Sequence, residues 1–415
     1  MTNSKIKYKH IFLVAYALLL MSRIMVLTNN YSLPINPIVL EFGYLAICVL
    51  LYIMSRGGKV KVLPKNASVV ILLLLFHTLL WGIVFVNASF PSLIHSMYRS
   101  QIIFVFIIAT TVLMIYEFDI MDEFIKTSFI VLVLILSVQF IFHIAEVNFT
   151  NIINVMSKDK RTRANFGFGH YNTLGAVCSC VIIIGFIAKN IISKPILHYS
   201  RILATIMLLC AASRSAITGV LVYFIAYFST NIDDYIISKR MVSLIKIARV
   251  VIVAVFSFWV FFEADLGSFL VEAQRSHLFF YTLPMFFRTN RVLIGLGYAS
   301  NTHYGTGVTP YTTYWLDNAY IYYLVTTGIL GLSVIIAAST LIFVYLYKAR
   351  KRNFDKKVFS LYMFYLYGSL FEVILFSSGT IINYIYLPIF VATIANPRKL
   401  QNNNIANIKH TFGFS

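Results

Sequence analysis

Three arginines in one long polar segment are the residues of this sequence best suited to chemistry. Arg275, Arg288 and Arg291 lie within residues 266–316, where Glu272 is the one carboxylate. The guanidinium group presents a planar fork of N–H donors that fits the oxygens of a phosphate group. A cationic segment with so little acidic compensation therefore predicts an anionic, phosphate-containing ligand.

Asp317 follows this segment directly and is the nearest candidate for a general base. A carboxylate at the start of a helix can equally cap the N–H groups of the first turn, so both roles stay open. The roles conflict, because a helix N-terminus and neighbouring arginines lower the pKa of a carboxylate and make it a weaker base.

The chain that must position these groups is strongly apolar. Of its 415 residues, 59% are hydrophobic and 12% are charged, which is typical of a polytopic membrane protein. We predict one all-α integral membrane domain over residues 1–415, with about 12 spans of roughly 20 apolar residues each. The predicted spans are 10–27, 37–54, 67–88, 99–116, 127–146, 168–189, 199–212, 215–231, 249–265, 317–347, 358–377 and 382–396.

The distribution of Lys and Arg predicts the orientation of the spans. With the N-terminus in the cytoplasm, most of the 34 Lys and Arg residues fall on the cytoplasmic side, as the positive-inside rule requires. Both termini are then cytoplasmic. The basic loop 147–167 and the large loop 266–316, between spans nine and ten, then lie outside.

The remaining cations gather at the starts of helices that run inward from the outer face. Arg99, Arg214 and the pair His170 and Asn172 lie at such N-termini, where free N–H groups and the helix dipole favour anions. Arg214 lies between two apolar runs too short to be separated by a real loop. For Arg99, contact with lipid headgroups is an equal alternative.

Arg163 ends a basic run inside loop 147–167. The run is Lys158, Lys160, Arg161 and Arg163, directly before the sequence GFGHYNTLG. Binding of lipid headgroups is the favoured interpretation of this run, and Arg163 is kept as a candidate substrate-binding residue.

The sequence lacks the signatures of metal, redox and nucleic-acid sites. The four cysteines fall inside predicted spans, without disulfide or metal spacing, and the nine histidines are scattered. The net charge of +19 reflects the orientation of the spans, and no soluble domain is present to carry a nucleic-acid interface. We expect no bound metal, no cofactor and no nucleic-acid partner.

Four motifs, in order, resemble those of the bacterial O-antigen and capsular polysaccharide polymerases and the related O-antigen ligases. They are NFGFGHYNTLGAV entering the sixth span, SRSA between two short spans, Arg275 followed by Gly295-Leu296-Gly297 in the large loop, and DNAYIYYLVTTGILG re-entering the membrane. Ligases typically carry a histidine where this chain has Asp317, so the departure favours a polymerase.

The resemblance implies metal-independent glycosyl transfer on the outer face of the bacterial cytoplasmic (inner) membrane. The donor would be a glycan on undecaprenyl pyrophosphate and the acceptor a lipid-linked repeat unit of O-antigen or capsule. Membrane lipids, a chain-length regulator and a flippase are the implied partners. Arg214, Arg275 and Arg291 would hold the pyrophosphate, with Arg288 behind them, and Asp317 would take the acceptor proton.

Two further residues gain a role from the same resemblance. Asn318 would bind sugar hydroxyls, and Tyr314 would stack on a sugar ring. Anchoring at the membrane interface is the default alternative for the tyrosines around Asp317. Gly328 and Gly331 are expected to break the tenth helix, so that its short outer part tilts over the site.

Three alternatives stay open: an O-antigen ligase, a polysaccharide-lipid flippase or other transporter, and a peptidoglycan-type polymerase. A transporter would need polar residues that line a path through the membrane. The candidates within the spans are scattered, and they could also pair with each other: Arg23, Glu41, His77, His143 and Glu372.

Overall fold

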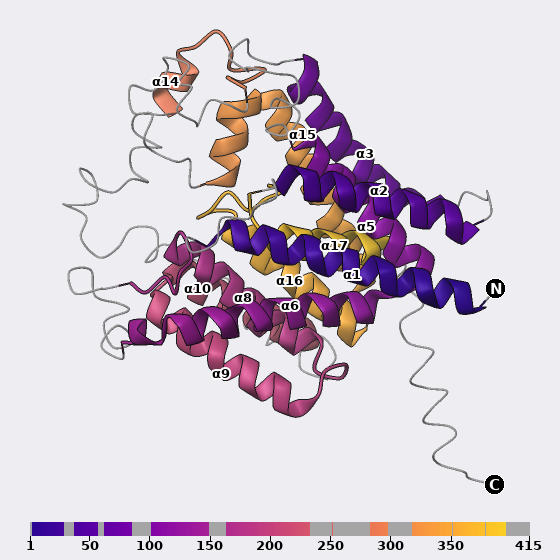
Figure 1. Cartoon of the computed structure of the whole chain (residues 1–415). Coiled ribbons are helices and arrows are strands. Elements are labelled where there is room, and N and C mark those ends of the chain that lie inside the picture. Colours follow the sequence, from indigo (N-terminus) through magenta and orange to yellow (C-terminus); the bar gives the residue numbers. More distant parts are fainter. Residues whose placement is uncertain are drawn as a thin grey trace.

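The protein is a bundle of helices (Figure 1). The computed structural model describes residues 2–28, 37–56, 62–84, 101–148, 163–232, 251, 283–297, 318–350, 352–377 and 379–395. Within these ranges the chain forms helices and no strand, so the expectation of an all-α protein is confirmed. The helices are α1 (Thr2–Val26), α2 (Pro37–Arg56), α3 (Lys65–Leu79), η1 (Leu80–Val84), α5 (Ile102–Phe118), α6 (Met121–Phe142), η2 (Ile144–Glu146), α8 (Tyr171–Ile187), α9 (Lys194–Ala211), α10 (Arg214–Ile232), α14 (Leu283–Phe287), α15 (Ala319–Ala349), α16 (Asn353–Gly368) and α17 (Asn383–Ala395).

Several of the described helices have the length and composition of membrane spans. Five are long and apolar enough to cross a bilayer: Ile6–Val26, Ile38–Ser55, Lys65–Ile83, Met121–Phe142 and Ala319–Ala349. Three shorter apolar helices accompany them: Ile102–Phe118, Tyr171–Ile187 and Asn383–Ala395. Large apolar side chains such as Val39 and Phe42 on α2 are exposed, which suits contact with lipid.

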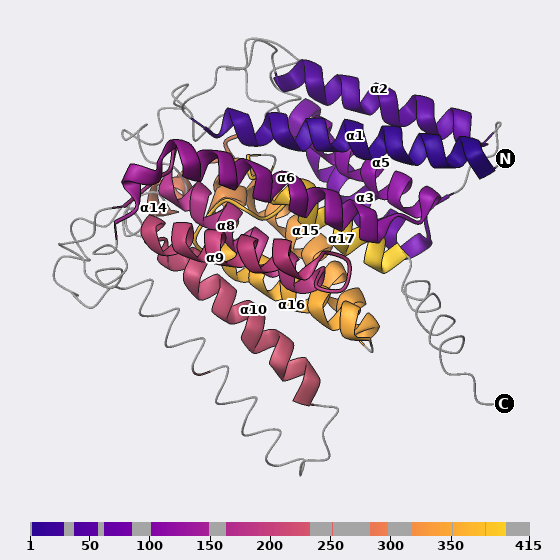
Figure 2. The same cartoon turned by 60° about the horizontal axis from the view of Figure 1, so that its bottom comes forward.

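The helix directions alternate through the bundle, and α17 lies at its centre. Figures 1 and 2 show the N-terminus at one end and the starts of α8 and α10 at the other. All thirteen residues of α17 are buried, among helices that include α3, α5, α15 and α16. On one side of the bundle, α8 packs between α9 and α10, and α10 packs on α16.

A described helix overlaps every predicted span except 249–265, of which the structure describes residue 251 alone. The span predicted at 358–377 is wrong in its second half, because α16 ends at Gly368 and residues 369–377 are not helical. The predicted boundary followed the apolar run at 370–376, but side chains from other elements satisfy the backbone there. The hydroxyl of Tyr323 donates to the carbonyl of Leu375 at 2.9 Å, and Asn383 donates to the carbonyls of Ile374 and Ser377. Non-helical backbone at membrane depth requires such internal partners.

The break expected in the tenth span is present at Gly328. This residue has φ +70° and ψ −173°, so α15 is two helices joined by a kink. Segment 292–297 docks into the kink through four backbone hydrogen bonds. Leu296 and Gly297 donate to Val325 and Thr326 at 2.8 Å, and Ile329 and Leu330 donate to Val292 and Leu293 at 3.0 and 3.1 Å. The groups freed by the break are thereby paired.

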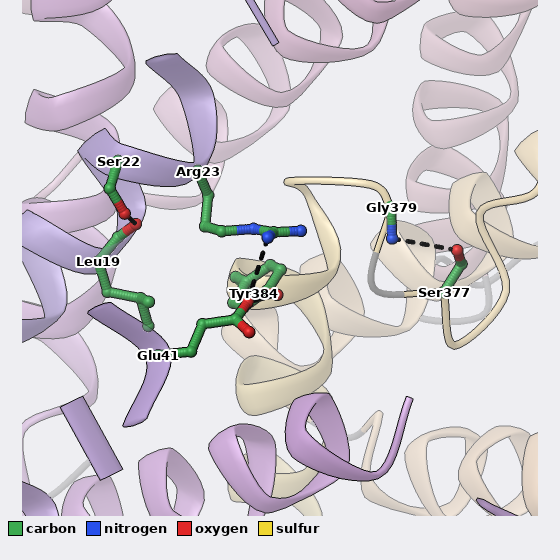
Figure 3. A network of polar contacts seen from close by, with 7 residues as sticks. All are labelled: Leu19, Ser22, Arg23, Glu41, Ser377, Gly379 and Tyr384. Atoms are coloured by element: carbon green, nitrogen blue, oxygen red, sulfur yellow. Dashed lines mark hydrogen bonds and ion pairs between the residues drawn. The ribbon is translucent and has the colours of Figure 1, made fainter. Parts of the chain in front are cut away.

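A buried ion pair joins the first two helices to α17 (Figure 3). Arg23 on α1 lies 3.2 Å from the carboxylate of Glu41 on α2, and both side chains are largely buried. Tyr384 on α17 donates its hydroxyl to the same carboxylate at 2.8 Å, and its ring centroid lies 5.3 Å from the Arg23 guanidinium carbon. Two of the scattered polar residues of the spans thus pair with each other.

Candidate functional site

The loop that leads into α8 is fastened to the ends of three helices. Ala164 donates to the carbonyl of Cys210 at the end of α9, and Gly169 donates to the carbonyl of Leu27 after α1. Glu146, after α6, accepts from the backbone N–H groups of Asn165 and Phe166 at 3.0 and 2.7 Å. These bonds fix the position of the residues before α8, including Arg163 and His170.

The start of α8 carries the sequence-predicted pair His170 and Asn172. The ring Nδ1 of His170 caps the helix by accepting from the Asn172 N–H at 3.2 Å. The ring of Tyr171, which lies between these two residues in the sequence, is tilted by 35° against the ring of His170, with the centroids 4.0 Å apart. The guanidinium carbon of Arg163 lies 4.0 Å from the centre of the Tyr171 ring. The cation of the loop is therefore held at the helix N-terminus by a cation–π contact.

Arg214 reaches the same helix end through a tight turn. Ala212 has φ +47° and ends α9, and α10 begins two residues later at Arg214, so no real loop separates the helices, as predicted. Ser213 lies against α8 at Gly175, where an added Cβ would come within 2.6 Å of the serine Cβ. Close approach of the backbones at this glycine brings the first turn of α10, with the buried Arg214, beside that of α8.

Glu372 completes the cluster and is the residue that sequence reasoning missed as a site residue. It lies in the non-helical segment after α16, and its Oε1 accepts from the Asn172 side-chain amide at 2.7 Å. The hydroxyl of Ser213 donates to the Oδ1 of Asn172 at 3.2 Å. The one signal in the sequence was an acidic residue within an apolar run, where ionisable groups are usually functional.

The positive charge of Arg163 acts electrostatically on His170 and on Arg214. Partial burial of the ring, and then the positive charge of Arg163, lower the pKa of His170, whose side chain remains partly in solvent. The same charge acts on Arg214. Two guanidinium groups near two helix N-termini form a strongly anion-attracting end of the bundle. A carboxylate beside them can accept a proton or a hydroxyl hydrogen bond.

Arg288 and Arg291 belong to a different part of the structure. Arg288 follows α14 and is exposed, and Arg291 is half-buried at the start of the segment that docks into the α15 kink. Trp81 also holds this segment, by donating to the carbonyl of Ile294 at 2.8 Å. Figure 1 shows α14 separated from α8 and α10, with the first part of α15 between them.

Asn318 is occupied as a helix cap. Its Oδ1 accepts from the N–H groups of Tyr320 and Ile321 at 3.0 Å, and its amide donates to the carbonyl of Leu370 at 2.8 Å. The capping role weighed for Asp317 is thus filled by the next residue. The binding of sugar hydroxyls expected of Asn318 would compete with these bonds.

The other predicted site residues lie outside the described residues. These are Arg99, Arg275, Tyr314 and Asp317. Within the described ranges, no group of three or more His, Cys, Asp or Glu side chains is arranged to hold a metal ion. Comparison of the sequence with models of protein families and with curated proteins gave no match.

Proposed function

We propose that this protein is a polysaccharide polymerase that joins undecaprenyl-pyrophosphate-linked repeat units by metal-independent glycosyl transfer. The observation that carries the proposal is that Arg163 and Arg214 lie at the adjacent starts of α8 and α10, where the carboxylate of Glu372 accepts a hydrogen bond from Asn172. The resemblance of the sequence motifs suggests the substrate. The structure suggests what two of these motifs do. NFGFGHYNTLGAV and SRSA build the two helix starts that meet.

The arrangement suits a reaction whose leaving group is a pyrophosphate. In the transfer, an acceptor hydroxyl oxygen bonds to the anomeric carbon of the donor glycan while the bond from that carbon to the pyrophosphate oxygen breaks. The electron pair leaves with the pyrophosphate, and the hydroxyl proton passes to a base. Guanidinium groups can stabilise the developing charge through paired hydrogen bonds. Asp317 is the base proposed from the sequence.

The site would face the outside of the bacterial cytoplasmic membrane. Two observations support this sidedness: the bias of Lys and Arg toward the opposite face, and the alternating helix directions that gather the starts of α8, α10 and α15 at one end. The full arrangement of 12 spans, cytoplasmic termini and an outer loop at 266–316 is part of the proposal. Arg275, Arg288 and Arg291 would reach the donor from that loop.

Reconstitution in proteoliposomes tests the proposal. The substrate is the lipid-linked repeat unit extracted from a host strain in which this gene is deleted, and the product is a ladder of polymer on a gel. We expect extension of the repeat units in excess EDTA, because arginines take the place of a divalent cation. Activity that disappears with EDTA and returns with magnesium or manganese would contradict the metal-free part.

The same experiment separates the alternatives. Transfer of the glycan to lipid A core in place of chain growth would identify a ligase. Movement of intact lipid-linked units across the bilayer, without any new glycosidic bond, would identify a transporter. In both cases the polymerase proposal fails.

A further inference from the structure

The non-helical segment after α16 brings a carboxylate to the arginine cluster, and its backbone is fixed. Glu372 donates its N–H to the carbonyl of Gly368 at 3.0 Å and accepts from the N–H of Ile374 at 2.8 Å. Two residues after Ile374, the backbone N–H of Phe376 donates to the hydroxyl of Tyr365 at 2.6 Å. A functional group on a rigid support keeps its geometry without ordering at the moment of reaction.

The carboxylate itself is oriented by a chain of two hydrogen bonds. Ser213, before α10, donates to the Oδ1 of Asn172 at 3.2 Å, which aims the amide of Asn172 at Glu372 Oε1 at 2.7 Å. The amide of Asn172 is a neutral donor, and its bond fixes the direction of the Glu372 carboxylate.

We propose that Glu372 is the general base of the transfer, oriented by Asn172 and Ser213. The assignment rests on the proposed function. The Glu372 carboxylate takes the proton of the acceptor hydroxyl as that oxygen bonds to the anomeric carbon. The sugar–pyrophosphate bond breaks, and the pyrophosphate leaves with the electron pair toward Arg163 and Arg214. The proton then passes from Glu372 to solvent, and the carboxylate is regenerated.

This assignment competes directly with Asp317, whose neighbour Asn318 contacts the Glu372 segment. Asn318, the neighbour of Asp317, donates to the carbonyl of Leu370, two residues before Glu372. Ala319 donates to the carbonyl of Ser369 at 3.0 Å. The start of α15 and the Glu372 segment are therefore joined at the same end of the bundle. Glu372 is linked to the start of α8 through Asn172, and Asp317 lies outside the described residues.

Glu372→Gln and Asp317→Asn in the proteoliposome assay separate the two acids. The glutamine keeps the volume and the oxygen that accepts from Asn172, so the fold-related bond survives and only the base is lost. We expect Glu372→Gln to lower kcat by roughly 10²–10⁴-fold, with KM for the lipid-linked unit changed little. Asp317→Asn should stay within a few-fold of the wild type. Glu123→Gln is the matched control, because Glu123 is a paired carboxylate at the opposite end of the bundle, beside Lys9.

A pH profile distinguishes a base from a structural residue. Asn172→Asp places a second carboxylate against Glu372, so that one of the two keeps its proton to higher pH. The acidic limb of the rate profile should move to higher pH, with activity partly restored in alkaline buffer. A merely structural loss would lower the rate equally at every pH. Glu372→Asp, which retains the carboxylate, should keep more activity than Glu372→Gln.

The outcomes distinguish a failure of the proposed function from a failure of the assignment to Glu372. Wild-type protein that makes no polymer sinks the proposed function and this assignment with it. Active wild type together with an active Glu372→Gln variant overturns the assignment alone. A loss of activity in Asp317→Asn, with Glu372→Gln unaffected, would return the role of base to Asp317.

Discussion

Replacing Gly328 with alanine puts a methyl group where backbone already lies. A Cβ at this position would overlap the carbonyl of Leu293 and the N–H of Gly295, in the segment docked against α15. Both are backbone atoms, so no side-chain rotation can make room. The φ of +70° with ψ near 180° is also a conformation that glycine adopts far more easily than any other residue.

The cost follows from these two effects. An L-residue in such a region costs roughly 1–3 kcal/mol. Moving segment 292–297 away stretches its four hydrogen bonds to α15, each worth roughly 0.5–1.5 kcal/mol net. Losing two of the four gives a total of roughly 2–6 kcal/mol. The segment should therefore undock while the rest of the bundle stays folded.

Trypsin cleavage of detergent-purified protein measures undocking, because Arg288 and Arg291 adjoin the docked segment. Fragments cut after these two residues, quantified by mass spectrometry, should form at least about tenfold faster in Gly328→Ala than in the wild type, since about 1.4 kcal/mol already gives tenfold more open form. Gly43→Ala is the control, because a Cβ there meets nothing within 4 Å. Equal cleavage of Gly328→Ala and Gly43→Ala would refute the reasoning.

Three further predictions concern the helix starts. Arg214→Lys keeps the charge but loses the fork, so polymer formation should fall roughly 10²–10³-fold, which is about 2–4 kcal/mol; wild-type rates would assign Arg214 to lipid headgroups. Asn318→Ala removes the cap of α15, at roughly 0.5–2 kcal/mol, and the donor to the Leu370 carbonyl, at roughly 1–3 kcal/mol. Its melting temperature should drop, and an unchanged value contradicts the cap. Because the pKa of His170 is lowered in the folded protein, stability is full above its ordinary value of about 6.5 and falls as the pH drops toward the folded value. The melting temperature should therefore decrease more between pH 7.5 and 5.5 in the wild type than in His170→Asn, and an equal decrease would contradict this.

Apolar runs predicted most of the helices because a bilayer allows few other solutions. A span must satisfy its backbone internally, so about 20 apolar residues in sequence nearly always form a helix. The non-helical segment 369–377 is the exception that the same rule explains. Its apolar residues gave the pattern of a helix. The partners that replace the helical hydrogen bonds are the side chains of Tyr323 on α15 and Tyr365 on α16. Hydropathy contains no information about such partners.

The candidate site was predictable where local sequence determines it. The tight turn around Ser213 and Arg214 followed from two short apolar runs, and the break at Gly328 followed from a glycine within a span. The role of Glu372 was not predictable, because its contact with Asn172 joins residues 200 positions apart. Their positive charge, on the side predicted from the Lys and Arg distribution to be the outer one, made Arg163 and Arg214 candidate residues. Their convergence needed the packing of α8 on α10 at Gly175.

The central position of α17 constrains the order in which the protein can assemble. During synthesis, α3, α5, α6, α15 and α16 are made before α17, yet they pack around it, and their inner faces are completed by its side chains. Until then Arg23 and Glu41 can meet each other, but Glu41 lacks the hydroxyl of Tyr384 and Arg23 lacks its ring. Packing of α17 ties the first two helices to the last one described, so the environment of the Arg23–Glu41 ion pair is completed only after α17 has been made.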